Sequence, residues 1–155
     1  MAGKTYILYS GLPGWSSEAP RKDKKFSDVI QYAVDAKYSW NPARREEGHV
    51  TEFGGLQISR WTNANTPELA IACIKQDQFA SVTLECEDDE RKVTMKIELK
   101  DCRLCAINYG NDPNGRTFQH EVWLGQHIFI ENPKASKKAD YSWAKPQDYA
   151  SKKWS

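Results

Sequence analysis

The strongest constraint on this chain is a strict alternation of apolar and polar side chains between Lys92 and Lys100. The apolar positions are Val93, Met95, Ile97 and Leu99, and the polar positions are Lys92, Thr94, Lys96, Glu98 and Lys100. Successive side chains of a β-strand point to opposite faces, so a period of two predicts a strand with one face on a core and the other in water. One-sided burial of this kind is typical of antiparallel sheets.

A second alternating segment runs from Asp28 to Trp40. Its even positions hold the bulkier apolar side chains, beginning with Ile30, and its odd positions are smaller and more polar. We expect the even face to pack into the core and the odd face to meet water. Further strands are predicted at Tyr6–Ser10, Leu56–Trp61, Phe79–Glu87, Cys102–Tyr109 and Phe118–Ile130. Within Phe79–Glu87 the expected core positions include Ala80, and Glu85 is expected to form cross-strand charge pairs with the lysines of Lys92–Lys100.

One helix start stands among these strands, at residues 65–68. Thr66 can accept a hydrogen bond from an unpaired amide, and Pro67 loses nothing at the first helical position. Glu68 suits the positive end of the helix dipole. We therefore expect a helix over residues 67–76, whereas the segment Asn41–Thr51 is expected to be an exposed loop.

Length and composition favour one ordinary globular domain over residues 1–155. The chain carries 22 Lys and Arg against 21 Asp and Glu, so it has no large positive field for phosphates and we expect no nucleic-acid partner. No stretch approaches the roughly 20 apolar residues that span a bilayer, so no membrane insertion is expected. The start lacks the features of a signal peptide, which predicts a cytoplasmic protein that leaves the cell only without a cleaved signal.

No residue pattern predicts catalysis, a metal or a cofactor. Cys102 and Cys105 have CxxC spacing, but on a strand residues three apart point to opposite faces, so we expect buried or half-buried thiols. His120 and His127 differ by an odd number and are expected to face opposite ways on one strand. No phosphate loop, nucleophile elbow or HExxH motif is present. The prediction is a protein that is not an enzyme.

The order of parts is more specific than any single motif. It comprises a strand at Tyr6-Ile7-Leu8 that ends near Gly11, a charged loop, a long alternating strand, a second loop, Leu56–Arg60 running through Asn63–Leu69 into the helix, further strands, and a tail bearing Tyr141-Ser142-Trp143. This order resembles the Hcp family of type VI secretion tube proteins from about Thr5 to Trp154. The best local match is Ser59–Ala72, where the family has a strand, a polar turn, Thr/Ser-Pro and a helix.

The resemblance implies a mainly β fold related to those of phage tail-tube proteins. Together with the residue patterns it predicts an antiparallel β-barrel or two-sheet β-sandwich with one flanking α-helix. It further implies that six copies close into a ring and that rings stack into a secreted tube whose lumen carries effectors. The expected partners are other copies of this chain and the sheath, spike and effector proteins of the secretion system.

The resemblance also implies two kinds of surface. We expect Gln31, Ala33 and Asp35 to face the lumen. On the strand pattern alone, an ordinary solvent-exposed face of a monomer is the more common explanation, and only the resemblance favours the lumen. The expected subunit interface comprises Arg44, Arg45, Glu46, Glu47, Tyr141 and Trp143. The first four replace a stretch that is often glycine-rich in the family. The aromatic and basic tail at residues 132–155 is expected to pack on its own domain or on a neighbouring subunit.

Two other classes of function stay open at this point. One is a monomeric β-sandwich module that binds carbohydrate or peptide through exposed Trp and Tyr side chains. The other is an enzyme with an unrecognised site, which would reveal itself as a cluster of titratable groups with strongly shifted pKa values. Assembly state separates the tube subunit from the monomeric module.

Overall fold

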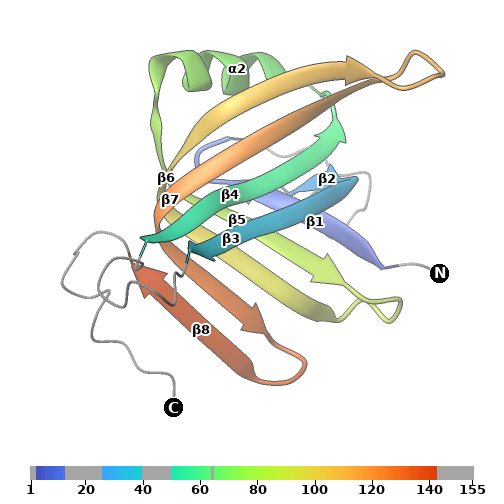
Figure 1. The fold of residues 1–155 in the computed structure, drawn as a ribbon. Coiled ribbons are helices and arrows are strands. Elements are labelled where there is room, and N and C mark those ends of the chain that lie inside the picture. The colour runs from blue at the N-terminus through green and yellow to red at the C-terminus, as the bar shows by residue number, and fades with distance from the viewer. Residues whose placement is uncertain (1–2, 13–25, 40–49, 64, 143–155) are drawn as a thin grey trace.

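The computed structural model describes residues 3–12, 26–39, 50–63 and 65–142. In these residues it contains eight strands and one helix (Figure 1). The strands are β1 (Lys4–Tyr9), β2 (Ser27–Val29), β3 (Gln31–Ser39), β4 (Val50–Trp61), β5 (Gln78–Glu87), β6 (Val93–Asn111), β7 (Thr117–Asn132) and β8 (Lys137–Ser142), and the helix is α2 (Thr66–Lys75). The mainly β fold with one helix that the sequence predicts is confirmed.

The strands form one antiparallel sheet that curls into a nearly closed barrel (Figure 1). Their order is β2-β1-β5-β6-β7-β4-β3, and β8 pairs with β7 beyond this path. The two ends of the order, β2 and β3, are separated in the chain only by Ile30, whose amide donates to the Ser59 carbonyl oxygen at 2.8 Å. One stretch of chain therefore pairs with β1 through β2 and with β4 through β3, which brings the sheet edges together.

Strand β6 changes the face that it buries part of the way along. Its buried side chains are Ile97 and Leu99 and then Cys102 and Leu104, so the buried positions pass from odd to even numbers. Asp101 lies at this change with a φ of 50°, in the left-handed region. Beyond Asp101 the even-numbered side chains face the core instead of the odd-numbered ones. Successive strand side chains point to opposite faces, and the irregular backbone at Asp101 shifts that order by one residue.

Strand β7 changes face beside the same point. Trp123 and Ile128 are both buried although they lie five residues apart, and Gly125 between them pairs with Cys102. A Cβ atom at Gly125 would lie 3.1 Å from the Lys100 carbonyl oxygen, so the close approach of the two strands favours glycine there. The bend divides the barrel into two parts, and each long strand contributes to both.

We name these parts by their strands. Half-sheet I consists of β2, β1, β5, β6 up to Lys100, β7 from His127, and β8. Half-sheet II consists of β6 from Cys102, β7 up to Gly125, β4 and β3. The prediction of a barrel or two-sheet sandwich is confirmed, since the two half-sheets enclose one core and are joined through the continuous strands.

The core lies between the half-sheets and is closed at one end by α2. Leu69 and Ala72 of the helix are buried in the same cluster as the strand residues, and α2 packs against β6 (Figure 1). The cluster comprises Ile7, Tyr9, Leu56, Ile58, Leu69, Ala72, Phe79, Val82, Leu84, Ile97, Leu99, Cys102, Leu104, Trp123 and Ile128. Burial of this apolar area is the main favourable term for the fold.

The helix matches the expected position but not the expected cap. It begins at Thr66, and Asn65 holds the N-cap position without a side-chain hydrogen bond to a helix amide. The Thr66 hydroxyl instead accepts from the Asn63 amide and donates to the Gln119 side-chain oxygen at 2.6 Å. Its hydroxyl therefore connects the helix to β7, so the prediction that Thr66 caps a helical amide is wrong.

The alternation expected in Asp28–Trp40 is present in β3. Tyr32 and Val34 pack against the core, whereas Gln31 and Ala33 are exposed. Ile30 was expected on the core face and is 47% exposed. It lies where the chain leaves β1 for β4, so its side chain belongs to neither packed strand.

Three other local expectations are wrong. Strand β4 begins at Val50, inside the segment expected to be a loop. Strand β8 forms in the polar tail, where no strand was expected. Strand β4 pairs with β7 only as far as Trp123, so β8 can pair with β7 from His127 onward. Ala80 is exposed while Phe79 is buried, since β5 changes its buried face beside Asp101.

Candidate assembly and lumen surfaces

The outer side of half-sheet II contains two neighbouring rows of side chains without formal charge. These side chains lie on the outer side because the alternate positions of the same strands, such as Ile58, Glu121 and Trp123, face the core. The first row is Gln31, Ser59, His120 and Asn108, and the second row is Ala33, Gln57, Val122 and Ala106. We call these eight residues the uncharged face. None of them is Asp, Glu, Lys or Arg, although such residues make up 28% of the chain.

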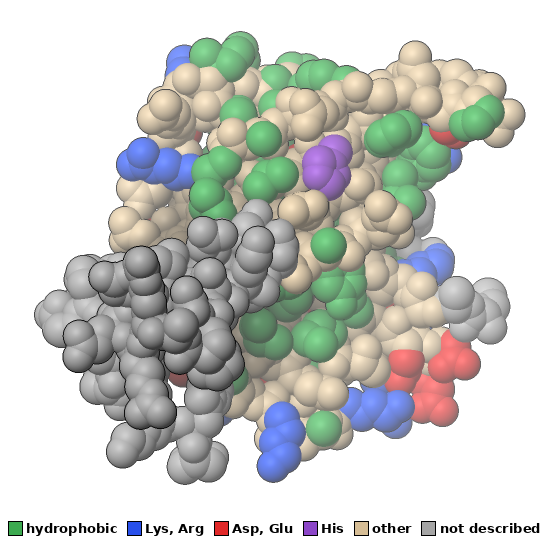
Figure 2. Space-filling view, viewed as in Figure 1, with side chains coloured by type: hydrophobic (Ala, Val, Ile, Leu, Met, Phe, Trp, Pro, Cys, Tyr) green, Lys and Arg blue, Asp and Glu red, His purple; other side chains and the backbone are tan. Residues whose placement is uncertain are grey.

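One hydrogen bond within the first row joins β4 to β7. The Ser59 hydroxyl oxygen lies 3.1 Å from His120 Nδ1, and both side chains are half-buried. Figure 2 shows this side of the molecule, where hydrophobic and uncharged polar atoms surround one histidine and the charged atoms lie toward the margins. The face offers hydrogen-bonding and apolar groups to a partner and no ion pair at its centre.

Half-sheet I presents the opposite kind of outer face. In one row Glu85, Lys96, Glu131 and Lys138 pair in register across β5, β6, β7 and β8. Charges therefore alternate from strand to strand, an arrangement that favours antiparallel pairing. The cross-strand partnership expected between Glu85 and the lysines of β6 is confirmed. We call this row the charged face.

An aromatic group lies beside the uncharged face at the β6–β7 hairpin. The Trp61 and Phe118 rings meet edge to face with centroids 6.5 Å apart, and Phe118 lies over Gly110 of the neighbouring strand. The guanidinium of Arg116 lies 4.0 Å from the centre of the Trp61 ring. A ring face covered by a cation is not open to stack on a sugar. Among the described aromatic side chains only Tyr109 is exposed, so this part of the chain offers no aromatic platform.

A buried polar network lies behind half-sheet II, on its core side. Arg60 and Glu121 are both fully buried, and Arg60 Nε donates to Glu121 Oε2 at 2.8 Å. The Tyr9 hydroxyl donates to Glu121 at 2.7 Å, and Trp123 Nε1 donates to the same carboxylate at 2.9 Å. Gln119 donates to it as well. The carboxylate thus accepts from four side chains and joins β1, β4 and β7.

The guanidinium extends this network to the helix. Arg60 Nη2 donates to Asn65 Oδ1 at 2.6 Å, directly before α2, while Arg60 Nη1 has no hydrogen-bond partner among the described residues. Burial lowers the pKa of Arg60, but the electrostatic interactions and hydrogen bonds with Tyr9 and Glu121 outweigh it, and the pKa is raised overall. Burial also raises the pKa of Tyr9 well above its usual value, with the charge of Glu121 acting in the same direction. Arg60 and Glu121 therefore form an ion pair, and the Tyr9 hydroxyl beside them is neutral.

The sequence itself contains a signal for this network. Arg60 follows Leu56 and Ile58 at the core-facing phase of one predicted strand, and Glu121 lies two residues before Trp123 on another. Opposite charges at core phases are costly unless they are paired, so a pairing was the physical expectation. The network is structural rather than catalytic, because every one of its members is buried and none opens to solvent.

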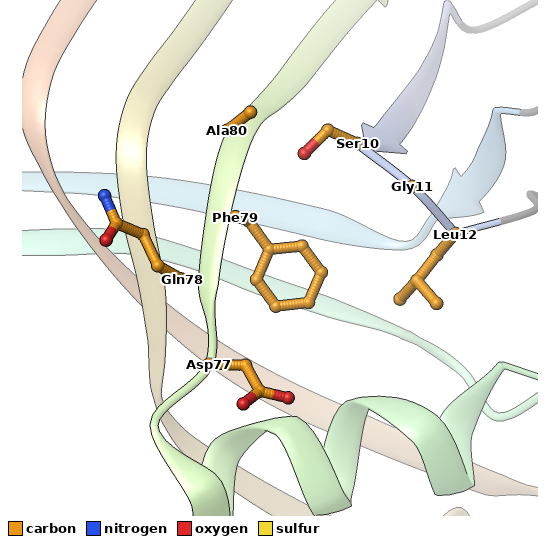
Figure 3. A pocket seen from close by; sticks show the side chains of 7 residues that line it. All are labelled: Ser10, Gly11, Leu12, Asp77, Gln78, Phe79 and Ala80. Atoms are coloured by element: carbon orange, nitrogen blue, oxygen red, sulfur yellow. The ribbon is translucent and has the colours of Figure 1, made fainter.

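A shallow groove lies between the end of β1 and the loop after α2. Figure 3 shows the Phe79 ring pointing toward Leu12 across it, with Asp77 beside the helix. Its volume is about 540 Å³, and its lining residues are Ser10, Gly11, Leu12, Asp77, Gln78, Phe79 and Ala80. Asp77 is the one titratable group in that set. The described residues of the groove therefore include no acid–base pair of the kind that a hydrolytic site requires.

The outer side of α2 carries two exposed isoleucines together with the charged residues Glu68 and Lys75. Ile71 is 50% exposed and Ile74 is 77% exposed, three residues apart on the helix surface. Their exposure contrasts with Leu69 and Ala72, which face the core.

The cysteines and histidines lie partly as expected. Cys102 is buried and Cys105 is exposed, so they do point apart, but the expectation of a buried or half-buried Cys105 is wrong. Burial raises the pKa of the Cys102 thiol to about 12, which keeps it protonated. His120 and His127 both lie on outer faces, contrary to expectation, because β7 changes its buried face between them. No group of three or more His, Cys, Asp or Glu side chains in the described residues is arranged to hold a metal.

The predicted surface residues are only partly within reach of the structure. Gln31 and Ala33 are exposed on the uncharged face, and Asp35 lies in β3 opposite Gly55. The backbone of Tyr141 lies in β8 opposite Ile128. Arg44, Arg45, Glu46, Glu47 and Trp143 lie outside the described residues.

Comparisons with known proteins find the fold and no sequence relative. No protein-family model matches the chain, and no curated relative matches its sequence. The structure of Hcp1 from Salmonella typhimurium has a TM-score of 0.76 and 12% identity over 92% of this chain and 96% of that one. Hcp1 from E. coli EAEC 042 has a TM-score of 0.77 and 8% identity over 92% and 99%. The secreted protein Hcp3 from Pseudomonas aeruginosa has a TM-score of 0.68 and 9% identity over 93% and 100%.

These matches span nearly the whole of each chain, so they concern the whole fold rather than one motif. No helix in the described residues is long and apolar enough to cross a membrane. Identities this low show likeness of fold alone. On the strength of these matches the chain has the fold of the Hcp proteins of type VI secretion, and the resemblance drawn from its order of elements is confirmed at that level.

Proposed function

We propose that this chain is the tube subunit of a type VI secretion system. Six copies close into a ring, rings stack into a tube inside the sheath and behind the spike, and the tube leaves the cell with effectors in its lumen. The role is structural and involves no catalytic step. The observation that carries the proposal is the Hcp fold over more than nine-tenths of the chain.

The difference between the outer faces supports this role. A tube subunit needs a surface toward the lumen and other surfaces toward its neighbours. We assign the uncharged face to the lumen, because it contains Gln31 and Ala33 and has no formal charge in either row. We also assign Asp35, from the same strand, to the lumen. We assign the contacts between subunits to Arg44, Arg45, Glu46, Glu47, Tyr141 and Trp143. The tail at residues 132–155 packs on its own domain or on a neighbouring subunit.

The solution mass of the purified protein tests the assembly. Light scattering behind a sizing column is expected to give a species of about six times the 17.8 kDa chain mass, and negative-stain microscopy is expected to show rings. A strict monomer over a wide concentration range would contradict the tube role. It would leave the Hcp fold as a description of architecture only.

Thiol labelling in assembled tubes tests the lumen assignment. We expect Ala33→Cys, in a Cys105→Ser background, to react with a small maleimide in both rings and stacked tubes, but to react with a bulky polymer-linked maleimide only in separate rings. The bulky reagent reaches a lumen thiol only through the two ends of a tube. Lys138→Cys, on the charged face, is the matched control position. The Cys105→Ser protein without an added cysteine measures the background reaction of Cys73, Cys86 and Cys102. Equal reaction of Ala33→Cys with the bulky reagent in rings and tubes would exclude this face from the lumen.

A further inference from the structure

The turn between β6 and β7 contains the one Asn-Gly dipeptide of the chain, at Asn114 and Gly115. Both residues are exposed at the tip of the hairpin. Gly115 has a φ of 81°, and its amide donates to the Asp112 carbonyl oxygen at 2.9 Å, which closes the turn. A Cβ atom at Gly115 would have no other atom within 4 Å, so the tip is open on that side.

The carboxamide of Asn114 is not held in place. Its side chain makes no hydrogen bond to any described residue, and only its main-chain amide is bonded, to Asp112 Oδ1 at 3.0 Å. Four other asparagines differ, since each has a side-chain oxygen that accepts a hydrogen bond: Asn63, Asn65, Asn111 and Asn132. A carboxamide that is held in this way cannot turn toward the main-chain nitrogen of the next residue, whereas that of Asn114 can.

Asn108 is the best comparison, because it is also exposed and its side chain also makes no hydrogen bond to a described residue. It lies inside β6, where it and the following Tyr109 pair with His120 and Gln119 of β7. The side chain of Tyr109 crowds the nitrogen that follows Asn108, and the ladder holds the backbone extended. Asn114 is followed by glycine in an exposed turn, where local opening costs little free energy and breaks the Gly115 hydrogen bond from time to time.

These features expose the Asn114 side chain to attack by its own main chain. Once the Gly115 amide nitrogen has lost its proton, it can bond to Cγ of Asn114. The bond from Cγ to Nδ2 breaks, and that nitrogen takes up a proton and leaves as ammonia. Water then opens the cyclic imide at one of its two carbonyl groups and gives an aspartyl or an isoaspartyl residue. Nothing is oxidised or reduced, and the only co-reactant is water.

We propose that Asn114 is a self-modification site, at which the folded protein converts the carboxamide to a carboxylate and loosens the tip of the β6–β7 hairpin. The product adds a negative charge, and its isoaspartyl form also lengthens the main chain. The turn is fixed by Asp112, whose amide donates to the Arg116 carbonyl oxygen at 2.9 Å and whose Oδ1 accepts from the Arg116 amide at 2.7 Å. A longer chain between these partners cannot keep both bonds in place. The conversion is independent of the tube role, because it requires only one turn of the folded chain.

Peptide mapping of the stored full-length protein tests the proposal. The protein is kept at physiological temperature in mildly acidic and in mildly alkaline buffer, and mass spectrometry with fragmentation locates each deamidated residue. Enzymatic methylation of isoaspartyl groups measures that product separately. Conversion at Asn114 is expected to exceed that at Asn108 and Asn111 severalfold, and to be faster in the alkaline buffer because the attacking amide must lose its proton.

Asn114→Gln is the matched variant, because its longer side chain would have to close a larger and less favourable ring. It is expected to remove the conversion at this position. Limited trypsin digestion after Arg116 is expected to be faster in stored than in fresh wild-type protein and unchanged by storage in Asn114→Gln. Equal digestion of stored and fresh wild-type protein would overturn the loosening of the hairpin. An Asn114 that converts only when the chain is unfolded in urea, or no faster than Asn108 and Asn111, would overturn the assignment of the site.

Discussion

Replacing Glu121 with alanine is expected to destabilise the fold by about 3–5 kcal/mol, because it leaves the buried charge of Arg60 without its counter-ion. The same change removes the acceptor of Tyr9, Gln119 and Trp123. Each of those donors would then be buried without its partner, and such groups cost free energy of their own. A loss of this size is a large fraction of the stability of a typical domain. The measurement is the urea midpoint of unfolding, followed by circular dichroism.

Two comparisons make this result specific to the buried pair. The double variant Arg60→Met/Glu121→Met removes both charges and keeps the volume, and it is expected to be more stable than either single variant. Lys134→Ala breaks an exposed contact, in which Lys134 Nζ lies 3.0 Å from Asp88, and is expected to leave the midpoint unchanged. A midpoint for Glu121→Ala equal to that of Lys134→Ala would show that the network does not stabilise the barrel.

Replacing Trp123 with alanine is expected to cost about 3–5 kcal/mol, which lowers Tm by about 6–20 °C in a chain of this size. The Trp123 side chain is fully buried where the two half-sheets and the helix end meet. Its ring lies 5.1 Å from Phe79 and 5.5 Å from Tyr9, centre to centre. Alanine would leave a cavity among side chains from three strands, and scanning calorimetry measures the loss.

A less buried tryptophan on the neighbouring strand gives the control. Trp61 is half-buried, and its ring is covered by Arg116 rather than enclosed by the core. Trp61→Ala is therefore expected to lower Tm by less than Trp123→Ala. Trp123→Phe retains an aromatic ring but loses part of the buried volume and the hydrogen bond to Glu121, so it should fall between the two. Equal effects of Trp61→Ala and Trp123→Ala would mean that Trp123 does not hold the half-sheets together.

Where a strand packs on the core with one face only, its sequence predicts its structure well. Ile97 and Leu99 of β6 are buried and Lys100 is exposed, as the alternation of Lys92–Lys100 requires. Tyr32 and Val34 of β3 behave in the same way. Such predictions succeed because the inside and outside of one sheet face impose a period of two on the chain, and a single sequence records that period.

The candidate surfaces were predicted less completely than the strands. Gln31 and Ala33 do lie together on an outer face, but their neighbours on that face come from β4, β6 and β7. Strand register decides which residues share a row, and register depends on pairing between segments far apart in the chain. Local pattern therefore does not predict the place of His120 in the middle of the uncharged face.

The sequence by itself determined the fold class, the position of the helix and the sides of the simple strands, because these depend on local pattern and on burial of one face. Only the tertiary structure decided where β6 and β7 change face, at Asp101 and Gly125, and how Arg60 and Glu121 meet inside. It also decided that β8 forms at all. Each of these features depends on the pairing partner and on enclosure by other strands, which are long-range properties that no local period records.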